Sequence, residues 1–431
     1  MTESHQYWGL LGPDGLASSR RVRTLDVGAA VRQFNELAVP GMGSVWTGRQ
    51  LLWPVLGVAA ATLARATHQV SNIEAANAVE ALACRLALAS NKWKRDARIR
   101  GLQKLQSTED LRFAVVRRPG FYVSQPMRMS AVQPLLALGL VESQSERFNA
   151  YKVAEPGEVL LSTACDPFVR ELPAKLARWM TDEASKTIQN LRAAITPLEP
   201  LPDLAAQALR ERLEGGSDSD SRRRRAALAW VRSKQSASST LDDWNGPVPA
   251  ELAPEHWTDL RAGASFFAAR DAALAVLDAC EHFMGPGGEP LSLKAPLPES
   301  VLEALDRARG TAADFLAKAQ GQSYHASGMT FCHELAGRDG PTTLKLLVGR
   351  DGRVLRLSGN DIMSGMAFDG GPPSVEAQAT AEAQDGDEAT AALASRARLP
   401  ANISFRMRNL LLLDLDLQKR LGAWLAAEAA A

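Results

Sequence analysis

The sequence lacks the short motifs that identify many enzymes. It has no GxSxG nucleophile elbow, no phosphate-binding GxxxxGK[ST] loop and no GxGxxG run behind a strand. Histidine is scarce, with 6 in 431 residues, and neither Cys280 with His282 nor Cys332 with its neighbours shows the paired spacing of a structural zinc site. We therefore predict no metal, no cofactor and no catalytic residues, which favours a non-enzymatic protein.

An excess of charge of one sign is missing too. Lysine and arginine together number 49, and aspartate and glutamate also number 49. A protein without net charge has no global field that attracts nucleic acid or an acidic membrane. Any basic binding surface must therefore be local.

Long apolar runs and paired cysteines are also absent. The most apolar segment, residues 51–64, would span about 21 Å as a helix, whereas the hydrocarbon core of a membrane is roughly 30 Å thick. The chain begins without the basic and apolar regions of a secretory signal. The four cysteines, Cys84, Cys165, Cys280 and Cys332, are scattered, as in proteins with buried free thiols in a reducing compartment. We expect a cytoplasmic protein with no membrane partner.

Helical periodicity dominates what is present. Apolar residues recur at helical spacing between residues 24 and 105, through most of 167–285 and again in 298–320. Ser71 with Glu74 three residues later predicts a capping box, and Thr108 is expected to start another helix. The chain is too long for one ordinary core. These features predict a mainly α, multi-domain protein with small β elements (α+β).

The expected organisation has six segments. They are a helical domain (1–110), a small module (111–165), a second helical domain (166–290), a helix and β-hairpin region (291–369), an acidic flexible linker (370–399) and a C-terminal helix (400–431). The hairpin is predicted at "TTLKLLVGRDGRVLRLSG", where Asp351 and Gly352 separate two β-rich runs.

The small module has the most informative pattern. Ser130 is expected to cap a helix through "AVQPLLALG", which Gly139 ends, while "LVES" and "RFNAYKVA" read as strands and "EPGEVLL" as the next helix. Residues 117–163 thus resemble the winged-helix superfamily. The preceding "RRPGFYVSQPMR", where that superfamily has a partner helix, favours an extended path instead.

The resemblance implies DNA binding by a short helix and an adjacent wing. Arginine and glutamine can reach base edges, and cations on phosphates supply affinity. The residues expected at this interface are Arg117, Arg118, Arg128, Ser130, Gln133, Arg147 and Lys152. The alternative is that the module only packs or docks proteins, because its helix consists mostly of alanine and leucine.

Other polar groups allow weaker hypotheses. The run Arg222–Arg225 could bind phosphates, but the aspartates before it favour a helix whose arginines face solvent or neighbouring carboxylates. "PGMGSVWTGRQ" could place an anion at a helix N-terminus, although a tight turn that anchors Trp46 and Trp53 in the core is favoured.

Three functions remain open at this stage. The favoured one is an adaptor or scaffold subunit of a bacterial multi-protein assembly, with a protein partner held by the leucine-rich C-terminal helix, in which Asp414 would pair with Arg406 or Arg408. Such an assembly would act on nucleic acid, as in defence or restriction-type systems. The second is a DNA-binding protein that uses the small module. The third is an enzyme centred on residues 324–364, with His325, His333, Asn360 and Asp361 around one cleft.

Overall fold

The computed structural model describes residues 23, 25–145, 147–164, 171–181, 191–235, 244–368 and 399–429. Helix makes up 61% and strand 4%, which confirms the predicted mainly helical fold with small β elements. Within the described ranges, no helix combines the length and the apolar composition needed to cross a membrane. Cys165 and residues 370–398 of the predicted linker lie outside these ranges.

The chain divides into two compact units. The hairpin unit comprises residues 1–31 and 268–383, and the helical unit comprises residues 32–267 and 384–431. Helices α1 (Gly28–Ala38) and α12 (Pro254–Met284) contribute to both. The small module and the C-terminal helix expected from the sequence belong to the helical unit, and the helix and hairpin region belongs to the hairpin unit.

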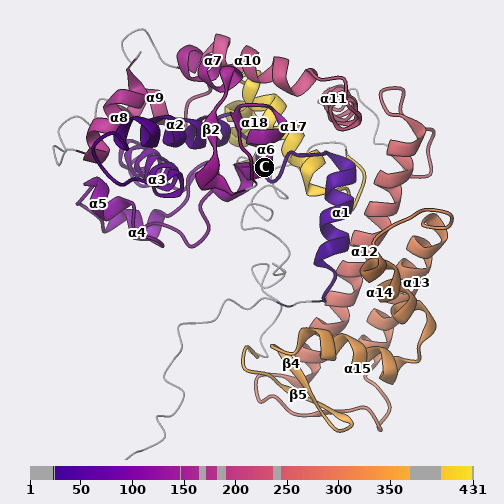
Figure 1. Ribbon diagram of the computed structural model, residues 1–431. Helices are drawn as coiled ribbons and strands as arrows, with labels where there is room; N and C mark the ends of the chain where they lie inside the picture. Colours follow the sequence, from indigo (N-terminus) through magenta and orange to yellow (C-terminus); the bar gives the residue numbers. More distant parts are fainter. Residues whose placement is uncertain are drawn as a thin grey trace, which may run out of the picture. The chain divides into compact units, whose positions relative to one another are not determined.

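The other elements of the helical unit are short to medium helices and one two-stranded sheet (Figure 1). They are α2 (Arg49–Ala64), α3 (Asn72–Ser90), α4 (Leu102–Gln106), α5 (Phe113–Val116), α6 (Arg128–Ala137), β1 (Val141–Glu142), a 3₁₀ turn (Phe148–Ala150), β2 (Lys152–Val153), α7 (Glu155–Ala164), α8 (Leu172–Thr181), α9 (Arg192–Ile195), α10 (Asp203–Glu214), α11 (Ser219–Ser233), α17 (Phe405–Leu417) and α18 (Leu421–Ala429).

Helices α2 and α3 form the centre of this unit. Both are buried on most of their circumference, and they lie side by side. Gly57 permits the close approach, because a Cβ atom at this position would lie 2.4 Å from the Cα of Ala76. The capping box at Ser71 and Glu74 is present as predicted, and Trp46 and Trp53 are buried in the same core.

The start predicted at Thr108 is wrong. No helix begins there: the Thr108 hydroxyl donates to the carbonyl of Lys104 at 2.8 Å, so it closes α4 instead. The next helix, α5, begins at Phe113 and has only 4 residues.

The leucine-rich C-terminal helix α17 is buried within the chain itself. All of its residues from Asn409 to Leu417 are buried, and it packs on α10 and α11. The predicted pairing of Asp414 with Arg406 or Arg408 is wrong. Asp414 instead accepts hydrogen bonds from Arg232 at 2.7 Å and from Gln235 at 2.6 Å. The helix therefore docks, as expected, but its apolar face is already covered.

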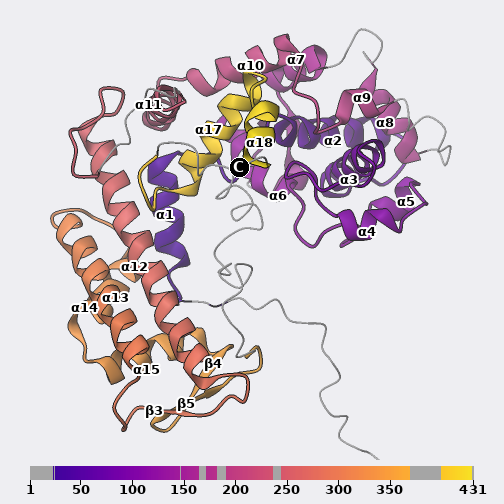
Figure 2. The same cartoon turned by 180° about the vertical axis from the view of Figure 1, so that it is seen from behind.

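The hairpin unit packs helices against a three-stranded sheet (Figure 2). Besides its parts of α1 and α12, it contains β3 (Leu291–Ser292), α13 (Glu299–Lys318), α14 (Ala326–Gly337), α15 (Gly340–Asp351), β4 (Leu355–Ser358) and β5 (Asp361–Ser364). The strand order is β3-β5-β4, and both pairings are antiparallel.

The hairpin lies later than predicted. Residues 340–351 form α15, so the prediction of a turn at Asp351 and Gly352 is wrong. Gly352, with φ +58°, ends this helix in the left-handed conformation that glycine favours. The real turn is at Gly359 and Asn360, where Ser358 pairs with Asp361. Asp351 and Gly352 thus end a helix. The sequence predicted a hairpin turn because a glycine in the left-handed conformation occurs both at helix ends and in hairpin turns.

Candidate functional site

The small module has a helix, two short strands and a helix in the expected order, but the second strand is wrong over most of its predicted length: Phe148–Ala150 form a 3₁₀ turn, and only Lys152–Val153 are a strand. Strands β1 and β2 pair antiparallel, with Val141 opposite Val153 and Glu142 opposite Lys152. Helix α7 follows β2 directly at Glu155, and Gly139, with φ +65°, comes just after the end of α6. The winged-helix resemblance itself remains a prediction, because element order does not define a family.

The N-terminus of α6 is already occupied by a carboxylate. Glu80 of α3 is buried and accepts the backbone N–H groups of Met127 at 2.7 Å and of Arg128 at 2.9 Å. The Tyr122 hydroxyl donates to the same carboxylate. The prediction that Ser130 caps this helix is therefore wrong: the N-cap position is Met127, three residues earlier, and the capping acceptor is supplied from α3. An external phosphate cannot use these N–H groups while Glu80 holds them.

Four of the seven residues predicted to bind DNA face inward or bond to this chain. Arg117 lies 3.6 Å from Glu74, and Arg128 donates to Asn77 at 2.8 Å. Gln133 accepts from Arg406 at 3.1 Å, and Ser130 is buried.

The other three, Arg118, Arg147 and Lys152, are exposed. Arg118 follows the end of α5, whereas Arg147 and Lys152 belong to the connection between the strands and to β2. DNA contact by all seven remains a prediction.

A second basic segment lies outside the small module. Residues 91–104, "NKWKRDARIRGLQK", contain six cations and one carboxylate. The net charge of the whole chain is zero and therefore does not reveal this segment. The net charge of short stretches of the sequence would have revealed it. It starts at the end of α3 and continues into α4.

The segment begins with a strained turn. Lys92 and Trp93 have φ values of +53° and +58°. These lie in the left-handed region, which residues other than glycine rarely adopt. The Trp93 N–H donates to the carbonyl of Leu88 at 2.8 Å, and the Arg85 guanidinium lies 4.5 Å from the centre of the Trp93 ring. These contacts hold the turn, and such strain often accompanies function.

Three cations of the segment anchor it to the unit. Arg98 donates to the carbonyl of Leu198 at 2.9 Å, Arg100 to that of Gln125 at 3.3 Å, and Lys104 to that of Gly120 at 2.8 Å. Arg98 also binds both carboxylate oxygens of Asp96, at 2.9 and 2.8 Å. Burial raises the pKa of Asp96, but these bonds from Arg98 outweigh it and lower the pKa below its ordinary value.

The other three cations point outward. Lys92, Lys94 and Arg95 are exposed, and no hydrogen bond or ion pair engages their side chains within the described part of the chain. We call these three residues the basic turn. A rigid turn with three unengaged cations is suited to bind phosphate groups.

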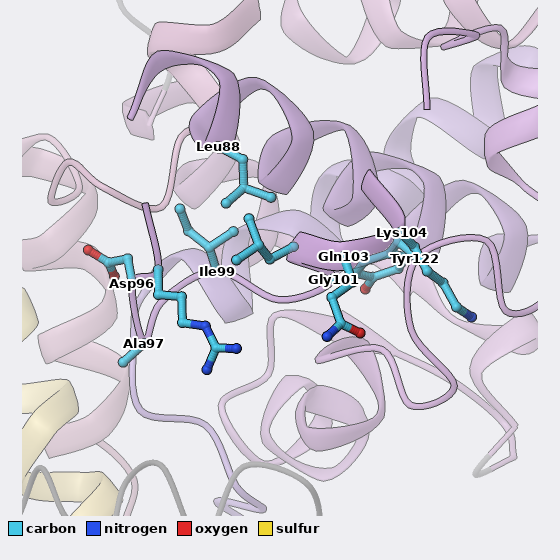
Figure 3. A pocket seen from close by; sticks show the side chains of 10 residues that line it. Leu88, Asp96, Ala97, Ile99, Gly101, Gln103, Lys104 and Tyr122 are labelled. Atoms are coloured by element: carbon cyan, nitrogen blue, oxygen red, sulfur yellow. The ribbon is translucent and has the colours of Figure 1, made fainter. Parts of the chain in front are cut away.

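The basic turn adjoins a pocket of about 540 Å³. Figure 3 shows Leu88 and Ile99 facing one another near Asp96 and Ala97, with Gln103, Lys104 and Tyr122 toward the other end. Arg95 and Leu102 complete the lining, together with Gly101. Gly101 has φ +80°, and a Cβ atom there would lie 2.9 Å from the Tyr122 ring. Glycine therefore lets α4 begin directly against Tyr122.

One lining residue of the pocket, Tyr122, is tied to the start of α6. Tyr122, which lines the pocket, bonds to the same Glu80 carboxylate that caps α6. Burial raises the pKa of Glu80 above its ordinary value, and burial together with the nearby Glu80 raises the pKa of Tyr122 well above its ordinary value. Cys84 is fully buried, and burial raises the pKa of its thiol to about 12, so this thiol is unreactive at neutral pH.

A second hollow, lined by Arg222, Arg223 and Arg225, is less suited to anions. Arg223 pairs with Asp259, and Arg225 donates to the carbonyls of Glu214 and Gly216 at 3.0 and 3.2 Å. Arg222 donates to the carbonyl of Ser217.

The run lies on α11, whose start is capped by Asp218. The helix with an acidic start is confirmed, and Arg223 faces a neighbouring carboxylate as predicted. The expectation is wrong for Arg224, which is buried and donates to the carbonyl of Pro40 at 3.2 Å.

The suggested catalytic cleft does not form a connected group. His325 caps α14 through Ser327, and His333 is exposed on the same helix. Asn360 accepts from Lys345 at 2.9 Å in the hairpin turn. Among the described residues, no group of three metal-ligating side chains occurs.

The geometry therefore favours the basic turn and its pocket as the candidate site. Comparison with known proteins adds no assignment: the chain matches no protein-family model, no curated protein and no solved structure at a significant level.

Proposed function

We propose that this protein is a non-catalytic nucleic-acid-binding subunit whose basic turn contacts backbone phosphates. The observation that carries the proposal is that Lys92, Lys94 and Arg95 are exposed and unengaged within the described residues, on a turn held by contacts to α3. Phosphate contacts supply most of the affinity of sequence-tolerant nucleic-acid binding.

We also retain the hypothesis that the protein is an adaptor or scaffold subunit, which would bind nucleic acid as part of a multi-protein assembly. Its main argument from the sequence was a leucine-rich helix available to a partner, and α17 buries that face against α10 and α11. A protein partner in a larger assembly, with the protein as a subunit, remains a proposal. The winged-helix-like module is the competing DNA interface.

The test is the affinity of the full chain for labelled single- and double-stranded oligonucleotides, measured by fluorescence anisotropy at several salt concentrations. Wild type should show a negative slope of log affinity against log salt. Replacing Lys92, Lys94 and Arg95 together with glutamine should flatten that slope by about 2, since each phosphate contact contributes roughly 0.7 to 0.9.

The matched control replaces Arg147 and Lys152 with glutamine. This variant removes exposed cations from the small module and leaves the basic turn intact. If it abolishes binding while the basic-turn variant binds like wild type, the DNA interface is the small module and the present proposal is wrong. Absence of salt-dependent binding by wild type would also refute it.

A further inference from the structure

We infer that the pocket beside the basic turn holds one unstacked nucleobase, so that the preferred ligand is single-stranded nucleic acid. This inference rests on the proposed function, because it assumes that phosphates bind at the basic turn. It adds a preference for single strands, which phosphate contacts at the basic turn alone would not give.

The pocket has the size and the surfaces that a base requires. Its volume of about 540 Å³ lies within the range of roughly 300 to 1,000 Å³ that is typical of small-ligand sites. Ile99 and Leu102 are partly exposed and supply apolar surface for the faces of a planar ring, and the buried side chains of Leu88 and Tyr122 complete the apolar lining. Bases bound outside a duplex are commonly held on apolar and aromatic side chains in this way.

Two polar groups of the lining could contact different parts of one nucleotide, the edge of the base and the phosphate. Gln103 is exposed, and its amide makes no hydrogen bond within the described residues, so it can offer both a donor and an acceptor to the edge of a base. Arg95 belongs both to the lining and to the basic turn, which places a cation where the phosphate of the same nucleotide would lie. Asp96 is held by Arg98, so its charge is balanced within the chain.

A duplex does not satisfy this arrangement. Its bases are paired and stacked, and extruding one into a pocket costs free energy that an unpaired strand does not pay. A duplex could still touch the basic turn through its phosphates. The pocket therefore discriminates between ligands that the basic turn alone would bind alike.

The experiment compares an oligonucleotide with an abasic strand of the same length and the same number of phosphates. We expect wild type to bind the base-bearing strand about tenfold more tightly than the abasic one, the effect of roughly one stacked base. Ala97→Phe fills the pocket and should remove most of this difference. Gln103→Ala removes the hydrogen bonds to the base edge and should weaken binding of the base-bearing strand more than binding of the abasic strand.

Gln106→Ala serves as the matched control, because Gln106 is exposed on α4 and does not line the pocket. It should retain the full difference. Gln103→Ala alters an exposed side chain, so the test stands even if Ala97→Phe fails to fold.

Equal affinity of wild type for the two strands, or a preference for duplex, would overturn the base pocket while leaving the proposed function intact. Binding of neither strand would overturn both.

Discussion

The backbone N–H of Gly48 donates to the buried carboxylate of Asp416 at 2.8 Å, across 368 positions of the chain. Gly48 precedes the first residue of α2, so Asp416 provides the negative charge that a helix N-terminus favours. The anion considered for "PGMGSVWTGRQ" from the sequence is thus a side chain of α17. Burial raises the pKa of Asp416 to about 6, although Gly48, Arg49 and Arg98 act in the opposite direction.

This raised pKa predicts a stability that falls with rising pH. The folded state holds the Asp416 proton more tightly than the unfolded state does, so the contribution is complete below about pH 4 and is lost as the pH rises through about 6. Asp416→Asn keeps an oxygen for Gly48 and removes the charge. At pH 8 it should raise the free energy of unfolding by about 3 kcal/mol, and near pH 4 the gain should vanish. Urea denaturation at the two pH values measures both; a less stable variant at pH 8 would contradict the argument.

A second prediction concerns the buried acceptor at the start of α6. Glu80→Ala should destabilise the protein by about 3 kcal/mol or more, because it leaves the N–H groups of Met127 and Arg128 and the Tyr122 hydroxyl without their acceptor. Tyr122→Phe removes one donor only and should cost about 1 kcal/mol. Denaturant titration of both variants gives the comparison. Equal losses would show that Glu80 acts through Tyr122 and not as the cap of α6.

Local signals predicted the local features of this fold. The two residues of the capping box, Ser71 and Glu74, are only three positions apart, and the structure contains this box. The signal at Asp351 and Gly352 is equally local, yet it was misread, because a left-handed glycine ends a helix as well as it forms a turn. What decided between the two was the packing of the preceding residues, which sequence periodicity did not reveal.

Long-range partners could not be predicted in the same way. Glu80 caps a helix that begins 48 positions later, and Asp414 pairs with Arg232 across 182 positions. The spacing of these residues along the sequence does not indicate that they are partners. The candidate site is intermediate: its cations were visible as a run in residues 91–104, whereas the pocket depends on Tyr122 from a different segment.

Arg23 supports a prediction that is specific to the hairpin unit. Its guanidinium is buried among carboxylates, 3.1 Å from Asp278 and 3.3 Å from Asp351, and it also pairs with Glu281. Arg23→Ala would leave Glu281 and Asp351 buried without this cation, a change that typically costs 3 to 5 kcal/mol, so we expect about that loss. Arg23→Lys should lose less, since it keeps the charge.

Hydrogen exchange followed by mass spectrometry can localise this effect. Protection should fall in α15 and the end of α12, whereas α3 of the helical unit should exchange as in wild type. A uniform loss of protection throughout the chain would show that the two units unfold together, and no loss would show that Arg23 is dispensable.

The strained turn gives a prediction in which stability and binding change in opposite directions. Lys92 has a φ of +53°, which costs an ordinary residue about 1 kcal/mol and costs glycine little. Lys92→Gly should therefore keep or raise the melting temperature, while flattening the salt dependence of single-strand binding by about 0.7. Lys92→Ala removes the same charge but keeps the strain, so it should weaken binding equally without the gain in stability. If both variants bind with the slope of wild type, Lys92 makes no phosphate contact, and the left-handed turn serves the fold rather than the ligand.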